Sequence, residues 1–150
     1  MSNEPLVTGE PKQIVLARLE ATGLQTITGF SSAYSDTFPD ALDGIKADAD
    51  TGPVSRKEFK FCIDVINQTL EDYFPCAPCY VCGYIFCVLT FGLSMLLPEP
   101  CTKELETNVE VVMKRINNRE EFLYRGIVWK LHRTPRAHAS WIEISQLLYE

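Results

Sequence analysis

The chain has 150 residues, a formal net charge of −6 and a sequence pI near 5.0. This length suits one domain with a core of its own. The acidic balance argues against a nucleic-acid partner, because binding phosphates requires an excess of Lys and Arg. The bases gather between residues 114 and 136, where they outnumber the acids. Such a segment either faces an anionic membrane surface or covers a solvated helix and strand, and both interpretations stay open.

The first residues, MSNEPLVTGE, lack the basic and apolar character of a signal peptide. We therefore expect the chain to start in the cytosol, where thiols stay reduced. Residues 1–23 are predicted to form a partly disordered leader with a short helix from Ile14 that ends at Gly23. Residues 24–150 are predicted to form a single domain, which begins with a strand at LQTITGF, residues 24–30.

The clearest predicted helix begins after Ser55, where SRKE has the pattern of a capping box with Glu58 reaching back. Its apolar residues recur at helical spacing and predict one buried stripe: Phe59, Cys62, Ile63, Ile66 and Leu70. The helix should end before Pro75.

A second amphipathic helix is predicted from a Thr102 cap to the Asn117-Asn118 pair. Its inward positions are Leu105, Val109, Val112 and Ile116. GIVWKLHR and SWIEISQLL then predict two strands joined by TPRAHA as a hairpin connection.

An uncharged run of 26 residues extends from Tyr73 to Pro98. Crossing a bilayer takes about 20 apolar residues, but prolines and glycines shorten the helical part to roughly residues 79–97. If the flanking strands share one sheet, both ends of the run lie on one side of any membrane. We therefore predict a re-entrant or interfacial segment, with a buried core helix as the alternative. The side chains predicted to meet membrane or partner are Tyr80, Tyr84, Phe86, Phe91 and Leu93.

Four of the six cysteines lie at the start of this run: Cys76, Cys79, Cys82 and Cys87. Their spacing is compatible with a zinc or iron–sulfur site, but the intervening residues are apolar and residues three apart in a helix share one face. The CAPC pair has no preceding strand of a thioredoxin-like unit. S-acylation fits best, because cysteines beside an apolar membrane segment are typical acceptors and two or more chains give stable anchoring. Neither a metal nor a cofactor is predicted.

No catalytic constellation is visible, since neither His132 nor His138 is adjacent to a cysteine. Cys62 lies on a helical apolar stripe and is interpreted as a core residue, whereas the role of Cys101 stays open.

From residue 24 to residue 147, the order of these features resembles the cysteine-rich hydrophobic domain (CHIC) proteins, together with golgin subfamily A member seven and the fungal Ras-palmitoylation accessory factor. Key stretches are GFSSAYSDTFPDAL, CGYIFCVLTFGLSM and RINNREEFLYRGIVWKLHR. The positions that carry the resemblance are Phe38, Pro39, Leu42, Asn67, Gly92, Asn117, Asn118 and Trp129.

The resemblance implies a non-catalytic accessory subunit that binds and stabilises a DHHC-type protein S-palmitoyltransferase. It would act on the cytosolic face of the Golgi, endoplasmic reticulum or plasma membrane, contacting membrane lipids and being itself palmitoylated on the four cysteines of the run. Neither a small-molecule substrate nor nucleic acid is implied. In the family the cysteines stand in consecutive runs, whereas here they are spaced. The alternatives are a palmitoylated trafficking or scaffold protein without a transferase partner, or a small cysteine-ligated zinc module.

The expected fold is therefore α+β, with a small antiparallel sheet and two amphipathic helices that flank a membrane-inserting hydrophobic helical segment.

Overall fold

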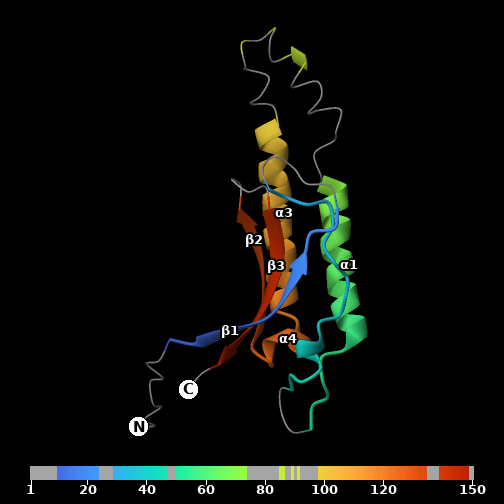
Figure 1. The fold of residues 1–150 in the computed structure, drawn as a ribbon, viewed down its shortest axis with the longest axis vertical. Coiled ribbons are helices and arrows are strands. Elements are labelled where there is room, and N and C mark those ends of the chain that lie inside the picture. Colours follow the sequence, from blue (N-terminus) through green and yellow to red (C-terminus); the bar gives the residue numbers. More distant parts are fainter. Residues whose placement is uncertain are drawn as a thin grey trace.

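The computed structural model describes residues 10–23, 29–46, 50–73, 85–86, 89, 91, 98–134 and 139–148. Its elements in chain order are β1 (Lys12–Glu20), η1 (Asp40–Leu42), α1 (Arg56–Tyr73), α3 (Pro98–Asn117), α4 (Glu120–Leu123), β2 (Ile127–Thr134) and β3 (Ala139–Leu148). The long helices α1 and α3 form a layer on one face of a three-stranded sheet (Figure 1). The described fold is thus mixed α and β with an antiparallel sheet, as predicted.

The sheet has the order β1-β3-β2, and both pairings are antiparallel. The pairing of Thr134 with Ala139 and of Trp129 with Ile144 confirms the predicted hairpin. Side chains alternate along these strands, so that Trp129, Ile142 and Ile144 are buried toward the helices. The core therefore lies between the sheet and the pair of helices.

The prediction of a helix from Ile14 is wrong, because this segment is strand β1. It pairs with β3 from the far end of the chain, for example Leu19 with Ile142, and has a bulge between Val15 and Ala17. The apolar run from Ile14 to Ala17, which begins with two β-branched residues, suits a strand once a partner is present. Lys12–Glu20 consequently belongs to the sheet and not to a leader.

The strand predicted at residues 24–30 falls largely outside the described residues, which exclude 24–28. Gly29 and Phe30 are described and lie outside any strand. Gly29 has a φ of 89°, a left-handed conformation that glycine adopts at little cost.

Helix α1 confirms the predicted stripe, since all five residues of the stripe are buried. Its N-terminus is stabilised differently from the predicted capping box. The amide of Ser55 donates to Glu121 Oε1 of α4 at 2.8 Å, while Glu58 pairs with Arg119. The predicted hydrogen bond between the Ser55 amide and Glu58 is wrong, because this amide donates to the carboxylate of Glu121, which is distant in sequence.

Helix α3 begins at Pro98, four residues before the predicted Thr102 cap. Prolines at positions 98 and 100 fit the first turn, where amide groups have no partner within the helix. The predicted inward positions Leu105, Val109 and Ile116 are buried, and Val112 is partly buried. Helices α1 and α3 run antiparallel beside each other, so Tyr73 and Pro98 lie at the same end of the molecule (Figure 1).

Candidate functional site

Most predicted residues of the hydrophobic run lie outside the described part of the chain. This holds for the predicted acyl acceptors Cys76, Cys79, Cys82 and Cys87 and for Tyr80, Tyr84, Gly92 and Leu93. The S-acylation hypothesis therefore stays a prediction.

The described residues within the run expose their apolar side chains. Ile85 is 62% exposed, Phe86 49%, Leu89 71% and Phe91 98%. Contiguous exposed apolar side chains mark surfaces that meet a membrane or a partner, and these four lie close together in the sequence. Of the helices in the described ranges, none combines the length and apolar character needed to cross a bilayer.

The described bases between residues 114 and 134 do not form one cationic surface. Three of them, Arg119, Arg125 and Arg133, are in ion pairs with glutamates. Lys114 and Arg115 lie in the last turn of α3, roughly 24 Å along the helix axis from its start at 1.5 Å per residue. These two cations consequently lie far from the end where the hydrophobic run begins and returns.

Several of the positions that carry the resemblance lie in an aromatic cluster between the sheet and the helices. Phe38 packs edge-on against Phe59 at a centroid distance of 5.3 Å. Trp129 contacts Phe59 at 5.5 Å and Phe122 at 5.4 Å. Leu42 is fully buried in the same cluster, and Pro39 precedes η1. These residue types therefore have a structural role here.

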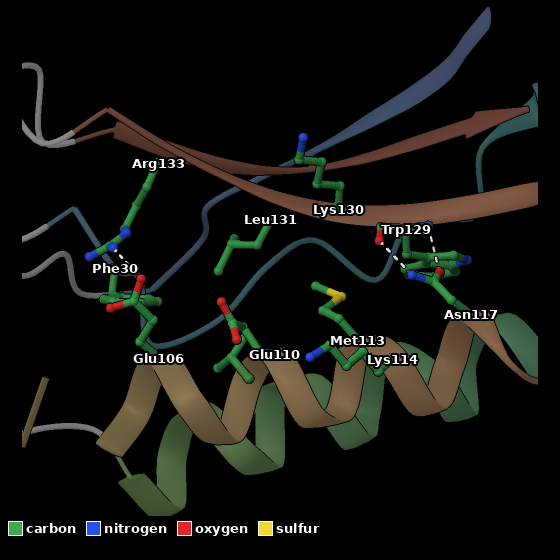
Figure 2. A pocket seen from close by; sticks show the side chains of 11 residues that line it. Phe30, Glu106, Glu110, Met113, Lys114, Asn117, Trp129, Lys130, Leu131 and Arg133 are labelled. Carbon is green, nitrogen blue, oxygen red and sulfur yellow. Dashed lines mark hydrogen bonds and ion pairs between the residues drawn. The ribbon is translucent and has the colours of Figure 1, made fainter. Parts of the chain in front are cut away.

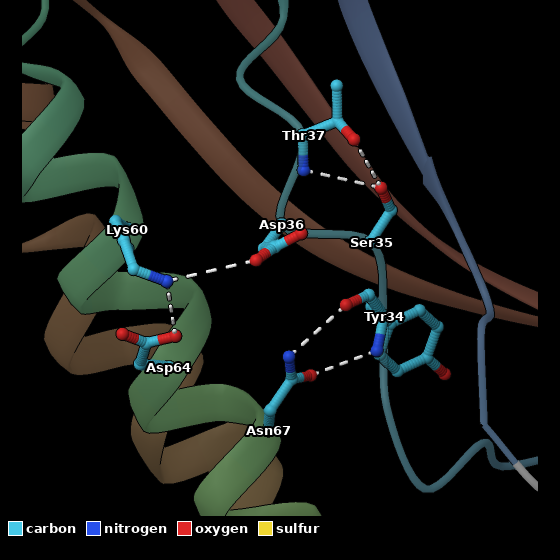
Figure 3. A network of polar contacts seen from close by, with 7 residues as sticks. All are labelled: Tyr34, Ser35, Asp36, Thr37, Lys60, Asp64 and Asn67. Carbon is cyan, nitrogen blue, oxygen red and sulfur yellow. Dashed lines mark hydrogen bonds and ion pairs between the residues drawn. The ribbon is translucent and has the colours of Figure 1, made fainter.

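Asn67 joins helix α1 to the loop after β1 (Figure 3). Its side-chain Oδ1 accepts the amide of Tyr34 at 2.9 Å, and its Nδ2 donates to the Tyr34 carbonyl at 3.1 Å. The Tyr34 hydroxyl lies 2.6 Å from Ser140 Oγ of β3. Burial raises the pKa of this phenol, while the Ser140 hydrogen bond opposes the rise. The loop is thus held between α1 and the sheet.

Surface contacts add to this attachment. Lys60 lies between Asp36, at 3.8 Å, and Asp64, at 3.5 Å, and Ser35 Oγ accepts the Thr37 amide at 3.3 Å (Figure 3). Exposed ion pairs of this type contribute little, typically below about 1 kcal/mol each. The paired amide of Asn67 is therefore the main polar attachment of the loop to α1.

Substituting Asn67 by alanine is expected to lower the free energy of unfolding by about 1–3 kcal/mol, because two partly buried backbone groups of Tyr34 lose their partner. Urea denaturation followed by circular dichroism measures the change. The neighbouring Gln68, whose amide bonds to Asp72 on the surface, is the matched control. Gln68→Ala should change stability by no more than about 0.5 kcal/mol, and an equal loss in both variants contradicts the assignment.

Asn117 makes the same type of contact at the end of α3. Its Oδ1 accepts the amide of Trp129 at 2.8 Å, and its Nδ2 donates to the Trp129 carbonyl at 3.1 Å. The next residue, Asn118, is exposed, and its amide donates to the Lys114 carbonyl at 3.1 Å. The sequence placed both asparagines at the helix end but gave no sign that one of them binds the strand that follows.

A groove of about 460 Å³ separates α3 from β2 (Figure 2). Its apolar lining includes Val109 and Met113 from the helix and Leu131 from the strand. At one end Arg133 pairs with Glu106 at 2.9 Å. At the other end lies the Asn117–Trp129 contact described above. The sequence did not predict this groove, because it depends on how the helix packs across the strand.

Cys62 lies between α1 and α3, lines a small pocket there and is fully buried. Burial raises the pKa of its thiol to about 12, the charge of Glu58 adds to the rise, and Arg119 opposes it. The thiol therefore stays protonated and unreactive at neutral pH. This confirms the interpretation of Cys62 as a core residue.

The raised pKa of Cys62 predicts a pH dependence of stability. The unfolded thiol ionises near pH 9 and the folded one near pH 12, so the folded state binds more protons between these values and the unfolding free energy falls as the pH rises through them. The advantage of the wild type over Cys62→Ala should therefore be smaller at about pH 10 than at about pH 7.5. Guanidinium unfolding of both proteins measures it, and an unchanged difference contradicts the expectation.

In the described parts of the chain, no group of three or more His, Cys, Asp or Glu side chains is arranged to hold a metal ion. Comparison with protein-family models found no match, and comparison with solved structures found none either. The functional assignment therefore depends on the residues and their arrangement.

Proposed function

We propose that the protein is a non-catalytic accessory subunit that binds and stabilises a DHHC-type protein S-palmitoyltransferase on the cytosolic face of a membrane. The uncharged run from Tyr73 to Pro98 is the membrane attachment. Cys76, Cys79, Cys82 and Cys87 are its acyl acceptors. The cysteine-rich start of this run and the family resemblance support the proposal.

The observation that carries it is the antiparallel packing of α1 and α3 (Figure 1). The chain leaves α1 at Tyr73 and enters α3 at Pro98 at one end of the molecule. A segment that enters a membrane from this end also leaves it here, which suits re-entrant or interfacial insertion. The exposed Phe86 and Phe91 support contact with an apolar environment.

If the hydrophobic run is the membrane attachment, the surface of the folded domain stays accessible to a partner protein. With Tyr73 and Pro98 at the membrane-facing end, the sheet and helices would extend away from the membrane for roughly 30 Å, the length of the 20-residue α3. A partner transferase held in the same membrane therefore meets the apolar run and this adjoining end of the domain first.

Acyl-biotin exchange on a variant with all four cysteines of the run changed to serine tests the acylation. We expect loss of the exchange signal and a shift from the membrane to the soluble fraction, because two or more acyl chains are needed for stable anchoring. Cys101→Ser serves as the control outside the cluster. Unchanged signal and unchanged membrane fraction in the four-serine variant would contradict the proposal.

Deletion of the protein tests the accessory role separately. Loss of an accessory subunit should lower the amount of its DHHC transferase, and the transferase should co-purify with the full chain in mild detergent. If the chain is palmitoylated but its deletion leaves the amount of transferase unchanged, the result supports a scaffold protein without such a partner.

A further inference from the structure

Strand β2 is an edge strand among the described residues, because the order β1-β3-β2 pairs it on one side only. In an antiparallel pair, successive residues alternate between exchanging hydrogen bonds with the partner strand and pointing their backbone groups away from it. The amide and carbonyl of Trp129 point away from β3, since Asn117 binds both. Leu131, two residues along, therefore also points its amide and carbonyl away from β3.

The contact of Asn117 shows that outward-facing backbone groups of this edge form hydrogen bonds with a group outside the sheet. A side-chain amide supplies one donor and one acceptor at 3.1 and 2.8 Å, the pattern that a neighbouring strand would supply. Beyond it, the described chain provides no hydrogen-bond partner for the backbone of Leu131. This position faces the groove between α3 and β2 (Figure 2).

The groove below this edge is partly apolar: Leu131, Met113 and Val109 line it, together with charged residues of α3 and β2. Leu131 and Met113 point into it from opposite sides (Figure 2). On an added strand, the residue beside Leu131 would share its face and lie over these side chains. The next residues along would point to the opposite face of the sheet, which neither α1 nor α3 covers (Figure 1).

The positive charge of Lys130 on that opposite face favours an acidic side chain on the added strand. Lys130 is exposed there and stands across from Glu143 of β3. No carboxylate of the described residues lies within ion-pair distance of its ammonium group. An acidic residue on an added strand would lie directly beside it, and such opposite-charge pairs favour pairing.

We infer that the edge of β2 binds an extended segment of a partner protein in which apolar and acidic residues alternate. The segment adds as a fourth strand: its backbone bonds Leu131, its apolar residues enter the groove and an acidic residue faces Lys130. Main-chain bonds supply affinity in such strand addition, and alternate side chains supply specificity. The inference does not depend on acylation of the hydrophobic run.

Selection from displayed random peptides of about nine residues, a typical strand length, tests the inference on the full chain in mild detergent. The wild type should enrich peptides that alternate apolar and acidic residues. Lys130→Glu, an exposed change that leaves the core untouched, should shift the preference from acidic to basic by roughly fivefold to tenfold. Retained acidic preference in this variant overturns the inference.

Two further measurements locate the bound peptide. Hydrogen exchange at the Leu131 amide should slow at least about tenfold when an enriched peptide binds, because the amide gains a hydrogen bond. Leu131→Pro removes this amide at an outward-facing edge position and should abolish enrichment, whereas Leu131→Ala, which keeps the amide, should retain it. Unchanged exchange at Leu131 overturns the inference even if the proline variant fails to fold.

Discussion

Replacing Trp129 by alanine is expected to lower the free energy of unfolding by about 3–5 kcal/mol, the cost typical of deleting a large buried aromatic side chain. Trp129 is 1% exposed. Its ring lies against Phe59 of α1 and Phe122 of α4, so it joins both helices to strand β2. Deleting the ring leaves a cavity where three elements meet.

Trp129→Phe is the matched control. The indole Nε1 of Trp129 is buried, and no group in the described structure accepts a hydrogen bond from it. Phenylalanine removes this unpaired donor and keeps an aromatic ring, so the loss should stay below about 1.5 kcal/mol. Guanidinium denaturation of both variants measures the difference. Equal losses would show that the ring contacts contribute little.

Replacing Arg125 by alanine is expected to lower the free energy of unfolding by about 1.5–3 kcal/mol, because two backbone carbonyls lose hydrogen bonds from a buried charged donor. The Arg125 side chain is 5% exposed. It donates to the Glu121 carbonyl at 2.6 Å and to the Gly52 carbonyl at 2.8 Å, and it pairs with the Glu121 carboxylate at 3.4 Å. It therefore holds the segment before α1 against α4.

Arg56→Ala is the control for Arg125→Ala. Arg56 also pairs with a carboxylate, that of Asp43 at 3.0 Å, but its side chain is 68% exposed. An exposed pair of this type contributes at most about 1 kcal/mol. Thermal unfolding of both variants should therefore show a clearly larger drop in Tm for the buried arginine. A similar drop in both variants would contradict the role of burial.

The sequence predictions that succeeded are those that depend only on neighbouring residues. The stripe of α1 from Phe59 to Leu70 repeats every three to four residues, and the strands of the β2–β3 hairpin alternate. Both patterns are contained in neighbouring residues and need no distant partner to be recognised. The absence of charge from Tyr73 to Pro98 is likewise visible in the sequence alone.

Predictions failed where a distant partner competes with a local one. The segment from Ile14 to Glu20 has residues compatible with a helix, but hydrogen bonds to β3 make it a strand. The pattern SRKE predicts a capping box at Ser55 and Glu58, yet the partners of these residues are Glu121 and Arg119.

The sequence by itself thus determined the two long amphipathic helices, the terminal hairpin and a cysteine-rich apolar run between the helices. The tertiary structure decided that both ends of this run meet at one end of the fold, that β1 completes the sheet and that the edge of β2 faces a groove. The physical reason is the sequence distance over which each interaction acts. The periodicity of apolar residues is local and predicts which face of a segment is buried. The hydrogen-bonding and ionic partners of a residue are set only when folding brings distant parts of the chain together.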